Sequence, residues 1–594
     1  MLSITALVFS ALLAEVWGAE DLSFPPGFKF GVASAAYQIE GAWNVSDKSE
    51  SIWDHFTHRT PSPIADSSSG DVACDSYHLW KEDINIVADI GAHFYRISVS
   101  WPRLLPTGFA DHVSEDGKNY YSNLIDGLLE KGIEPIITLY HWDLPQTLQN
   151  LGGWTNPLVV DWFSDYARVV YSLYGDRVKT WLTINEVWVV CDIPYMTGIF
   201  APGAVNEVGA YICTKNVLMA HAKAWRVYDE EFRPKYHGEV SLANHVIWME
   251  AANETEEMTA QLMREYQEAR FSHPIYSKEG GWPPVIEREI ADFSRKGGYP
   301  WSILPTLTKE EIELIKGTYD FYALNFYNSK LVRRGRKDEV LTPWPVGDAP
   351  LFNVKLEFHP DWPVIMDYYS YYPEGLRKQL TWLKQQYGDI PILITESGRG
   401  TYGGLDDQDR IHYYKNYMKQ VLLSIKEDGV NVTGFTAWTI MDNFEWISGY
   451  NTKFGLYEVD FTSPLLTRTP RASAKYYASV IRSHSLDVAY NLTANVAPKS
   501  SKSQDSKTPY IIFGGLILVI VVGVMAAIIG CRVKRRARLD KKRQYAAVSN
   551  NGAQNGTNSG AQNVTNSGAQ NGANSGAQNG TQHGVDESRI LLTT

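Results

Sequence analysis

Eight short runs of β-branched and aromatic residues recur along the chain. The runs are Phe30–Ser34, Phe94–Trp101, Glu134–Trp142, Thr180–Asn185, Glu239–His245, Phe321–Phe326, Pro391–Thr395 and Thr433–Thr439. Several are almost continuously apolar, as expected of parallel strands covered on both faces. Intervening segments such as Leu124–Lys131, Trp162–Tyr174 and Gly375–Gln386 have helical spacing. Eight strand–helix units predict an α/β fold, a (β/α)8 TIM barrel in one large domain.

An open, doubly wound sheet is the alternative architecture for this alternation. That fold requires a glycine-rich phosphate-binding turn after an early strand, and the sequence contains none. Seven of the runs carry reactive or ring side chains at or near their ends, namely Arg96, His141 with Trp142, Asn185 with Glu186, Asn244 with His245, Asn325 with Tyr327, Glu396, and Trp438. Strand carboxyl ends meet at one rim of a closed barrel, and its chemistry lies there. The sequence therefore favours the barrel and predicts a site at that rim.

Two glutamates close corresponding strands. Glu186 follows Thr183-Ile184-Asn185, and Glu396 lies within Ile394–Gly398. A single glutamate after a strand is usually a solvated loop residue or a helix N-terminal charge, but two at one rim indicate paired acid chemistry. Glycoside hydrolysis uses two carboxyl groups and no metal. The sequence has no HExxH, CxxC, P-loop or GxSxG-based triad, so we expect no metal and no cofactor.

Four further segments carry recognisable motifs. They are Phe28–Gly41 (FKFGVASAAYQIEG), Tyr95–Pro106 (YRISVSWPRLLP), Tyr140–Pro145 (YHWDLP) and Trp438–Trp446 (WTIMDNFEW). With Thr183–Val187 and Ile394–Gly398, they resemble the family 1 glycoside hydrolases, the β-glucosidase family, from about Phe24 to Leu486. The resemblance implies a retaining β-glycosidase on a (β/α)8 barrel. Its partner would be a small-molecule β-glycoside, a terminal glucoside first and a galactoside or fucoside next.

The resemblance also assigns roles to single residues. Glu186 matches the general acid/base and Glu396 the nucleophile, and retention requires the two carboxyls to lie about 5–5.5 Å apart. Glu186 would hold a proton near the working pH while Glu396 stays ionised, because Arg96 and Tyr327 match the partners of the nucleophile. The sugar-binding positions of the family are matched by Gln38, His141, Asn185, Asn325, Trp438, Glu445 and Trp446.

Some positions bear on specificity and on activity. As a carboxylate beside the sugar 4- and 6-hydroxyls, Glu445 would repel a phosphate, so we expect an unphosphorylated glycone. Val187 replaces the usual Pro of the family and Ser397 the usual Asn, and either change could loosen the backbone that aims a glutamate. Ala243–Glu254 and Gly335–Asp361 are expected to be loops that form the aglycone pocket.

Two other functions fit parts of the sequence. A thioglucosidase (myrosinase-like) acting on glucosinolates can dispense with the acid, because its thiol-linked aglycone leaves unaided; Glu186 is present, which favours an O-glycosidase. A catalytically weak, membrane-tethered glycoside-binding protein would typically lack one of the two glutamates, and both are present here. Both alternatives stay open at this point.

The two ends of the chain predict membrane anchoring. Residues 1–18 form a short apolar run typical of a secretory signal. Residues 511–531 form an uncharged run of 21 residues, long enough to cross a hydrocarbon layer of about 30 Å. Eight basic residues follow between Arg532 and Arg543, so the N-terminal bulk is expected outside. We therefore expect a single-pass type I protein of the cell membrane, with a glycosidase domain at 19–490, a linker at 491–510 and a cytoplasmic repeat tail within 532–594.

Charge and cysteine content narrow the remaining possibilities. The net charge of −12 argues against a nucleic-acid partner, which would require a basic face. Candidate glycosylation sites are the sequons at Asn44, Asn253, Asn431 and Asn491. Cys74, Cys191 and Cys213 lie in the predicted oxidising region, and since their number is odd at least one is unpaired. The sequence fixes neither the pairing nor the oligomeric state.

Overall fold

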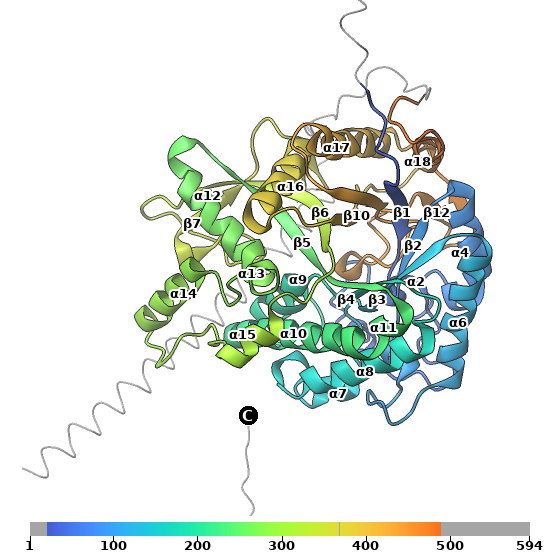
Figure 1. The fold of residues 1–594 in the computed structure, drawn as a ribbon, viewed down its shortest axis with the longest axis horizontal. Helices are drawn as coiled ribbons and strands as arrows, with labels where there is room; N and C mark the ends of the chain where they lie inside the picture. The colour runs from blue at the N-terminus through green and yellow to red at the C-terminus, as the bar shows by residue number, and fades with distance from the viewer. Residues whose placement is uncertain (1–20, 367–368, 489–594) are drawn as a thin grey trace, which may run out of the picture. The chain divides into compact units, whose positions relative to one another are not determined.

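The computed structural model describes residues 21–366 and 369–488. Within them, eight parallel strands form the ring at the centre of Figure 1: β1 (Lys29–Ala33), β2 (Phe94–Ser98), β3 (Glu134–Tyr140), β4 (Thr180–Asn185), β5 (Glu239–Ala251), β6 (Tyr322–Arg334), β10 (Ile392–Ser397) and β11 (Val432–Ala437). β1 pairs with β2 and β11, and β10 pairs with β11 and β6, so the ring is closed. The predicted barrel is confirmed.

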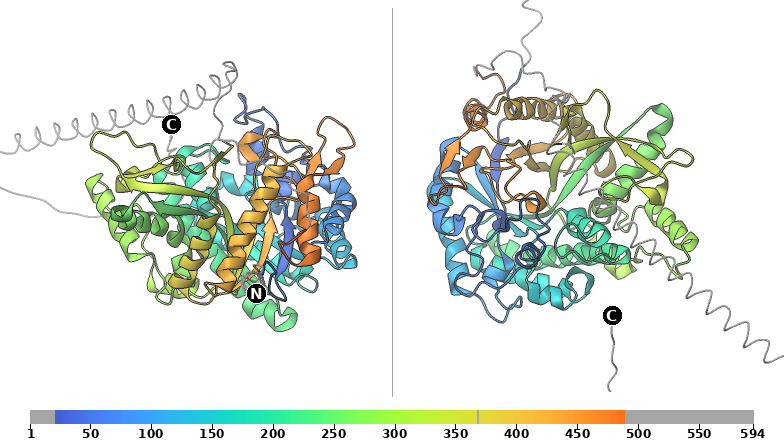
Figure 2. Two further views of the ribbon diagram at one scale, coloured as in Figure 1. Left: turned by 90° about the horizontal axis from the view of Figure 1, so that it is seen from above. Right: turned by 180° about the vertical axis from the view of Figure 1, so that it is seen from behind.

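Helices cover the outside of this ring, as Figure 1 and Figure 2 show. The longer ones are α4 (Ser76–Ile90), α6 (Glu115–Glu130), α8 (Val159–Tyr174), α10 (Glu207–Val227), α14 (Pro284–Lys296), α16 (Pro373–Tyr387), α17 (Gln408–Lys426) and α18 (Ala472–Ser483). In α8, Phe163, Ala167, Val170 and Tyr174 are all buried, and this spacing gives the helix one apolar face. That face packs inward, which is why the segment forms a barrel helix.

Shorter helices lie in the connections. Their bounds are α2 (Ala36–Ile39), α3 (Ile52–Thr57), α5 (Trp101–Leu104), α7 (Gln146–Asn150), α9 (Val187–Asp192), α11 (Arg233–Tyr236), α12 (Glu257–Arg264), α13 (Arg270–Tyr276) and α15 (Lys309–Ile315). Short 3-10 or π-helical segments occur at η1 (Gly153–Thr155), η2 (Ile193–Thr197), η3 (Tyr228–Phe232), η4 (Glu254–Glu256), η5 (Glu265–Ala269), η6 (Pro350–Phe352) and η7 (Trp446–Ser448).

The barrel interior changes character along the strands. A buried apolar cluster forms its lower layer, made of Phe94, Ile136, Leu182, Ala243, Phe321, Ala323 and Leu393. Side chains two residues further along a strand point to the same face, and at those positions stand Arg96, Thr138, His245 and Asn325. The apolar layer closes one end of the barrel, and the polar layer above it builds the site.

Two strands run well beyond the predicted ends. β5 continues to Ala251 and β6 to Arg334, and the two stay paired as far as Ala251 and Val332. The short antiparallel strand β7 (Val354–Glu357) adds to the extension of β6. The prediction of a loop at Ala243–Glu254 is therefore wrong over most of its length, because pairing with β6 satisfies its backbone groups beyond the rim. Shorter pairs outside the barrel are β8 (Val364–Ile365) with β9 (Tyr369–Ser370) and β12 (Tyr457–Val459) with β13 (Arg468–Pro470).

Among the cysteines that the structure describes, Cys191 and Cys213 form a disulfide, and Cys74 is a free, buried thiol. The expectation of at least one unpaired cysteine is confirmed. The disulfide connects α9, which starts immediately after Glu186, to the long helix α10. It therefore fixes the helix that follows one of the two predicted catalytic glutamates.

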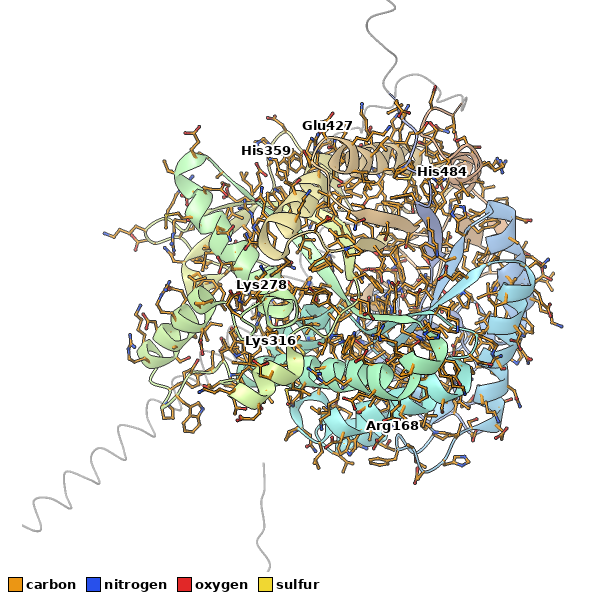
Figure 3. All side chains as sticks on the ribbon, in the orientation of Figure 1. Arg168, Lys278, Lys316, His359, Glu427 and His484 are labelled. Carbon is orange, nitrogen blue, oxygen red and sulfur yellow. A yellow bond between two sulfur atoms is a disulfide. The ribbon has the colours of Figure 1, made fainter. Side chains whose placement is uncertain are left out.

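The outer surface carries the polar side chains. Figure 3 labels Arg168 on α8, Lys316 after α15 and Glu427 after α17, all on the periphery of the barrel. The sequon residues Asn44, Asn253 and Asn431 are exposed. Asn491 and the predicted signal, linker, membrane span and tail lie outside the described residues. No helix in the described part of the chain has the length and apolar character needed to cross a membrane.

Candidate active site

Both predicted catalytic glutamates follow irregularities in their strands. The register of β4 against β5 shifts just before Asn185, and that of β10 against β6 shifts just before Glu396. Bulges re-aim side chains and are common beside active sites. Glu186 then adopts a left-handed backbone with φ of 59°, while its N–H donates to the Ala243 carbonyl at 2.8 Å. Strain at a residue other than glycine is typical of a functional position.

Glu396 is held by a cation and a hydroxyl. Arg96 Nη1 donates to Glu396 Oε1 at 2.6 Å, and Tyr327 Oη donates to Oε2 at 2.7 Å. The guanidinium is itself fixed, because it also donates to Thr138 Oγ1 at 3.0 Å and to the Thr395 carbonyl at 3.1 Å. Arg96 is 1% exposed and Glu396 3% exposed, so this ion pair is shielded from solvent. The predicted partners of the nucleophile are thus brought to it.

Glu186 lies in a different environment. Asn325 Nδ2 donates to Glu186 Oε1 at 2.7 Å, and His245 Nδ1 lies 3.4 Å from Oε2. The carboxyl is 4% exposed. Its hydrogen-bond donor is a neutral amide, whereas Glu396 has a guanidinium. The two carboxyls therefore receive unequal stabilisation of their charged forms.

A chain of hydrogen bonds connects the two glutamates. Asn325 Nδ2 also donates to Asn185 Oδ1 at 3.0 Å, and the same oxygen accepts from Arg96 Nη2 at 2.7 Å. Arg96 in turn binds Glu396, and the Cα of Glu396 is registered against that of Asn325. Both carboxyls thus belong to one network at one rim. The amide groups of Asn325 are used within this network, since its Oδ1 accepts from Thr395 at 2.7 Å.

The pKa of Glu396 depends on burial and on the charged groups around it. Burial raises the pKa of Glu396 to about 7, the Arg96 guanidinium opposes this rise, and the charge of Glu186 adds to it. The hydrogen bond from Tyr327 also lowers the pKa. The nearby charge of Glu186 is thus one of the causes that keep the pKa of Glu396 above its ordinary value.

Gln38 is oriented for ligand contact. Its Nε2 donates to Asn443 Oδ1 at 3.0 Å and to the Phe444 carbonyl at 2.9 Å, and it lies 3.4 Å from Glu445 Oε2. Its Oε1 is buried and has no hydrogen-bond partner within the described residues. A buried acceptor of this kind requires a partner, so this oxygen is available to a donor group on a ligand.

His141 supplies a complementary donor. Burial holds its pKa well below the ordinary value, with Arg96 adding to the effect, so the imidazole is neutral. Asn185 Nδ2 lies 3.1 Å from Nε2, which therefore accepts, and the proton belongs on Nδ1. Nδ1 is buried and has no partner within the part of the chain described. The ring of Trp438 stacks on His141 at 5.7 Å and provides an apolar wall.

Glu445 differs from the expected carboxylate. Loss of hydration in the pocket raises its pKa to about 8, and the charges of Glu396 and Glu186 add to this rise. Burial is thus the largest cause, and the two neighbouring carboxyls are the next. With a pKa in this range, the group can donate as well as accept a hydrogen bond near neutral pH.

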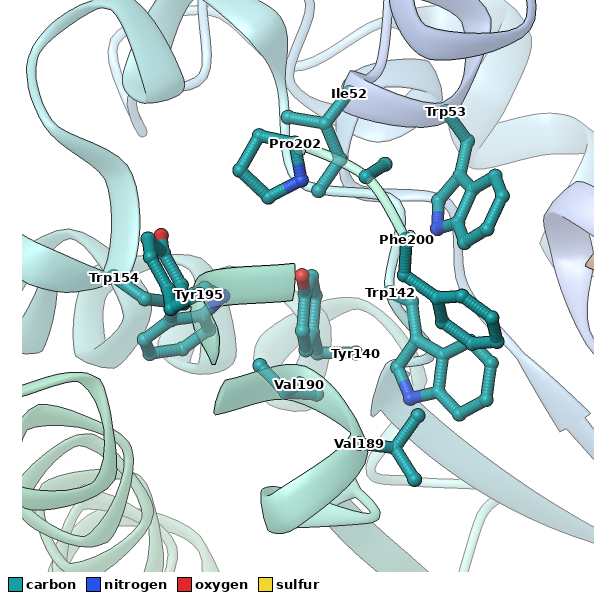
Figure 4. A pocket seen from close by; sticks show the side chains of 11 residues that line it. Ile52, Trp53, Tyr140, Trp142, Trp154, Val189, Val190, Tyr195, Phe200 and Pro202 are labelled. Atoms are coloured by element: carbon teal, nitrogen blue, oxygen red, sulfur yellow. The ribbon is translucent and has the colours of Figure 1, made fainter. Parts of the chain in front are cut away.

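An aromatic wall supports the sugar pocket. The ring of Trp446 lies 4.3 Å from Trp142 and 4.6 Å from Trp53. Trp142 Nε1 donates to the Asn185 carbonyl at 2.9 Å, so this wall also fixes the strand that carries Glu186. Behind it is a small apolar hollow, in which Figure 4 shows Trp53, Phe200 and Trp142 on one side and Tyr195 and Trp154 on the other.

The two departures from the family pattern are accommodated by the backbone. Val187 is the first residue of α9 and fully buried. Proline is favoured at a first helical position because its fixed φ suits the helix and its missing N–H would have no helical partner. The helix α9 nevertheless starts at Val187. Ser397 is the last residue of β10, and its Oγ lies 3.1 Å from Tyr413 Oη. Val187 is therefore packed in the core, and Ser397 is held by a hydrogen bond.

No cluster of His, Cys, Asp and Glu suited to a metal ion occurs in the described residues. The family model described as glycosyl hydrolase family 1 matches residues 20–486. The chain belongs to glycosyl hydrolase family 1. It is an O-glycosyl hydrolase by this membership, and the match spans the whole barrel.

Two relatives of this family 1 chain align with it over nearly their full length. Myrosinase 1 of Brevicoryne brassicae is 43% identical over 471 residues, covering 78% of this chain and 99% of that protein. The cytosolic beta-glucosidase of Homo sapiens is 39% identical over 476 residues, with 78% and 99% covered. The solved structure of an aphid myrosinase has a TM-score of 0.73 and 42% identity, with 77% of this chain and 99% of that chain covered.

Sequence reasoning did not identify every residue of the family 1 site. Thr138 and Thr395 hold the Arg96 side chain, and Trp142 supports Asn185, but the sequence assigned them no role. His245 was noted only as a polar residue near a strand end. Its position two residues after inward-facing Ala243 was the available signal, because alternation places it in the polar layer of the barrel.

Proposed function

We propose that this family 1 enzyme hydrolyses terminal β-D-glucosides and retains the configuration at the anomeric carbon. The observation that carries the proposal is the unequal pair of carboxyls, Glu396 bound to Arg96 and Glu186 bound to Asn325, within one network at one rim. Two carboxyls in such unequal surroundings are suited to a nucleophile and an acid.

In the first step the two groups act on opposite ends of one bond. Protonated Glu186 gives its proton to the glycosidic oxygen while the Glu396 carboxylate attacks the anomeric carbon. The bond from that carbon to the aglycone oxygen breaks, and the aglycone leaves as an alcohol. Arg96 and Tyr327 favour charge on Glu396 before attack. The product of this step is an ester between Glu396 and the sugar.

In the second step the roles of Glu186 reverse. Formation of the ester removes the negative charge of Glu396. The repulsion between the two carboxylates, which acts in the free enzyme, is therefore absent from the ester. Glu186, now a carboxylate, takes a proton from water as the water oxygen attacks the anomeric carbon. The bond to Glu396 breaks, and the sugar leaves with its original configuration. Two inversions therefore give net retention.

The sugar is held by groups that have free hydrogen-bonding capacity. Gln38 Oε1 offers an acceptor and His141 Nδ1 a donor, while Glu445 can serve as either. Trp438 and Trp446 offer ring faces to the C–H side of the sugar. Asn185 fits a contact to the 2-hydroxyl, which strengthens as positive charge develops on the sugar ring. This arrangement suits an uncharged, terminal glycone such as glucose.

Thioglucoside cleavage is the second candidate. The observation that favours it is the 43% identity to a protein named Myrosinase 1. A thiol-linked aglycone leaves without protonation, so an enzyme specialised for it has no need of an acid. Here Glu186 is present and buried beside a hydrogen-bonding amide. We therefore favour O-glucosides as the substrates.

The test is a glycoside panel on the purified protein. Nitrophenyl β-D-glucoside, β-D-galactoside and β-D-fucoside are compared with one thioglucoside, and the anomer first released is identified by NMR. We expect turnover of the glucoside with β-glucose as first product. A 2-fluoro glucoside with a good leaving group should add one sugar mass to the peptide that contains Glu396. Inverted product, or no turnover of any O-glycoside, would contradict the proposal.

We also propose that the catalytic domain lies outside the cell on a single-pass type I protein. The support is the apolar run at 511–531 and the basic residues that follow it. In cells that express the full chain with a C-terminal tag, an antibody to the barrel should label intact cells, and an antibody to the tag only permeabilised ones. Labelling of the tag on intact cells, or secretion of the full-length protein, would contradict this topology.

A further inference from the structure

His245 occupies the barrel interior beside the predicted acid/base. It lies on β5, with its Cα registered against that of Asn325 on β6. Its Nδ1 is 3.4 Å from Glu186 Oε2, while Asn325 binds the other oxygen of the same carboxyl. The two residues therefore approach the Glu186 carboxyl from neighbouring strands, one at each oxygen.

The backbone and the ring of His245 are both fixed. Its carbonyl accepts from Trp188 Nε1 at 2.9 Å and from Gln267 Nε2 at 3.0 Å. Its ring packs against the Trp188 ring at 5.2 Å and edge-on against the Tyr327 ring at 5.5 Å. The side chain is thus confined between a residue of α9 and the tyrosine that binds Glu396. Little freedom is left for the ring to turn away from Glu186.

The ring nitrogens of His245 have no hydrogen-bond partner in the described part of the chain, although the residue is only 8% exposed. A buried imidazole without a partner is costly. The nearest titratable group is the Glu186 carboxyl, and catalytic hydrogen bonds that are long in a free enzyme tighten in the reacting complex. The charge on Glu186 changes during the reaction, so a donor at Nδ1 becomes most valuable when that carboxyl is ionised.

We propose that His245 is a positioning residue for Glu186, donating from Nδ1 to Oε2 as the carboxyl loses its proton to the leaving group. The proposal rests on the proposed role of Glu186. Asn325 holds Oε1 throughout, and His245 holds Oε2 once it is charged. The proton moves from Glu186 to the glycosidic oxygen, and no covalent bond of His245 is made or broken.

The leaving group of the substrate separates this role from a structural one. Phenyl β-D-glucoside requires protonation of its leaving oxygen, whereas dinitrophenyl β-D-glucoside does not. Because kcat/KM covers only the steps up to the first bond cleavage, its ratio for the two substrates reports the acid. Damage to the sugar pocket or to Glu396 would lower both values alike.

Two substitutions at the site make the test. His245→Leu keeps a branched side chain without a donor, and His245→Asn keeps an N–H near the place of Nδ1. We expect His245→Leu to lower kcat/KM on the phenyl glucoside by about tenfold or more. On the dinitrophenyl glucoside the loss should be under about threefold. His245→Asn should recover most of the loss on the phenyl substrate. The matched control is Glu239→Gln at the exposed start of the same strand, which should leave the ratio unchanged.

Each result has one meaning. Equal losses on both substrates, with no recovery in His245→Asn, would assign His245 a structural role and overturn the proposal. Unchanged kcat/KM in His245→Leu would overturn it as well. If His245→Leu does not fold, the His245→Asn and wild-type proteins still decide, because an intact ratio in His245→Asn is required. Failure of the wild-type protein to cleave either glucoside would instead contradict the proposed function.

Discussion

Glu396 and Glu186 are the same residue type at the same rim, but their surroundings differ in charge. Glu396 accepts from the Arg96 guanidinium and the Tyr327 hydroxyl, whereas Glu186 accepts from the Asn325 amide and has His245 at a longer distance. Both carboxyls are almost fully buried. Burial alone therefore cannot distinguish them, and the fixed cation does.

This difference shows how one chemical group serves two functions. A buried carboxyl beside a cation is stabilised as an anion, and one beside neutral donors keeps its proton more readily. At Glu396, burial raises the pKa to about 7, and the Arg96 guanidinium and the Tyr327 hydroxyl oppose this rise by stabilising the anion.

Removing each carboxyl in turn should give the largest effects. We expect Glu396→Gln to lower kcat by about 10⁴-fold or more on every glucoside, because no covalent intermediate can form. Glu186→Ala should lower kcat/KM strongly on phenyl glucoside and little on dinitrophenyl glucoside. Added azide should restore turnover of the second variant only, giving β-glucosyl azide. The exposed Glu313→Gln on α15 serves as control, and equal behaviour of the two variants would show that the roles are not divided.

Removing the hydrogen bond from Tyr327 to Glu396 should have an intermediate effect, which appears in the pH dependence of activity. Tyr327→Phe removes a donor that lowers the pKa of Glu396, so this pKa should rise further above its ordinary value. Since the nucleophile must be ionised, kcat/KM falls as pH drops through the pKa, and the acidic limb should move to higher pH by about one unit. The measurement is kcat/KM against pH on dinitrophenyl glucoside. A limb that stays in place would mean that Tyr327 does not stabilise the anion.

Removing the disulfide that holds α9, the helix after Glu186, should have the smallest effect on activity. The double variant Cys191→Ala, Cys213→Ala opens a loop with a sequence separation of 22 residues, which is worth about 3 kcal/mol of unfolding free energy. We expect a lower Tm and a change in kcat/KM of under about threefold, falling on phenyl rather than dinitrophenyl glucoside. The buried Asp192–Arg270 ion pair still holds the helix. Cys74→Ala is the control, and an equal loss on both glucosides would contradict the assignment to the acid side.

The sequence predicts the barrel because its strands are local patterns. All eight runs correspond to barrel strands, and the residues at their ends meet at one rim. The lengths of β5 and β6 were not predictable, because each is a strand beyond His245 and Phe326 only through pairing with the other. Pairing between segments that are distant in the sequence adds no periodic pattern to the sequence of either segment.

The site was predictable in composition but not in electrostatics. Glu445 was expected to be ionised, but burial raises its pKa to about 8, and two carboxyls that lie far away in the sequence add to the rise. His245 carries no signal beyond its place on a strand, since its meaning depends on the distance to Glu186. The pairing of Cys191 with Cys213 was equally unreadable, because three cysteines allow more than one bond.

The side chains that contact the two glutamates come from three strands: Arg96 from β2, His245 from β5, and Asn325 and Tyr327 from β6. A molecule whose barrel is incompletely assembled therefore has no functional active site. During refolding, secondary structure should therefore return before hydrolytic activity does. The return of activity should coincide with the pairing of the last barrel strand.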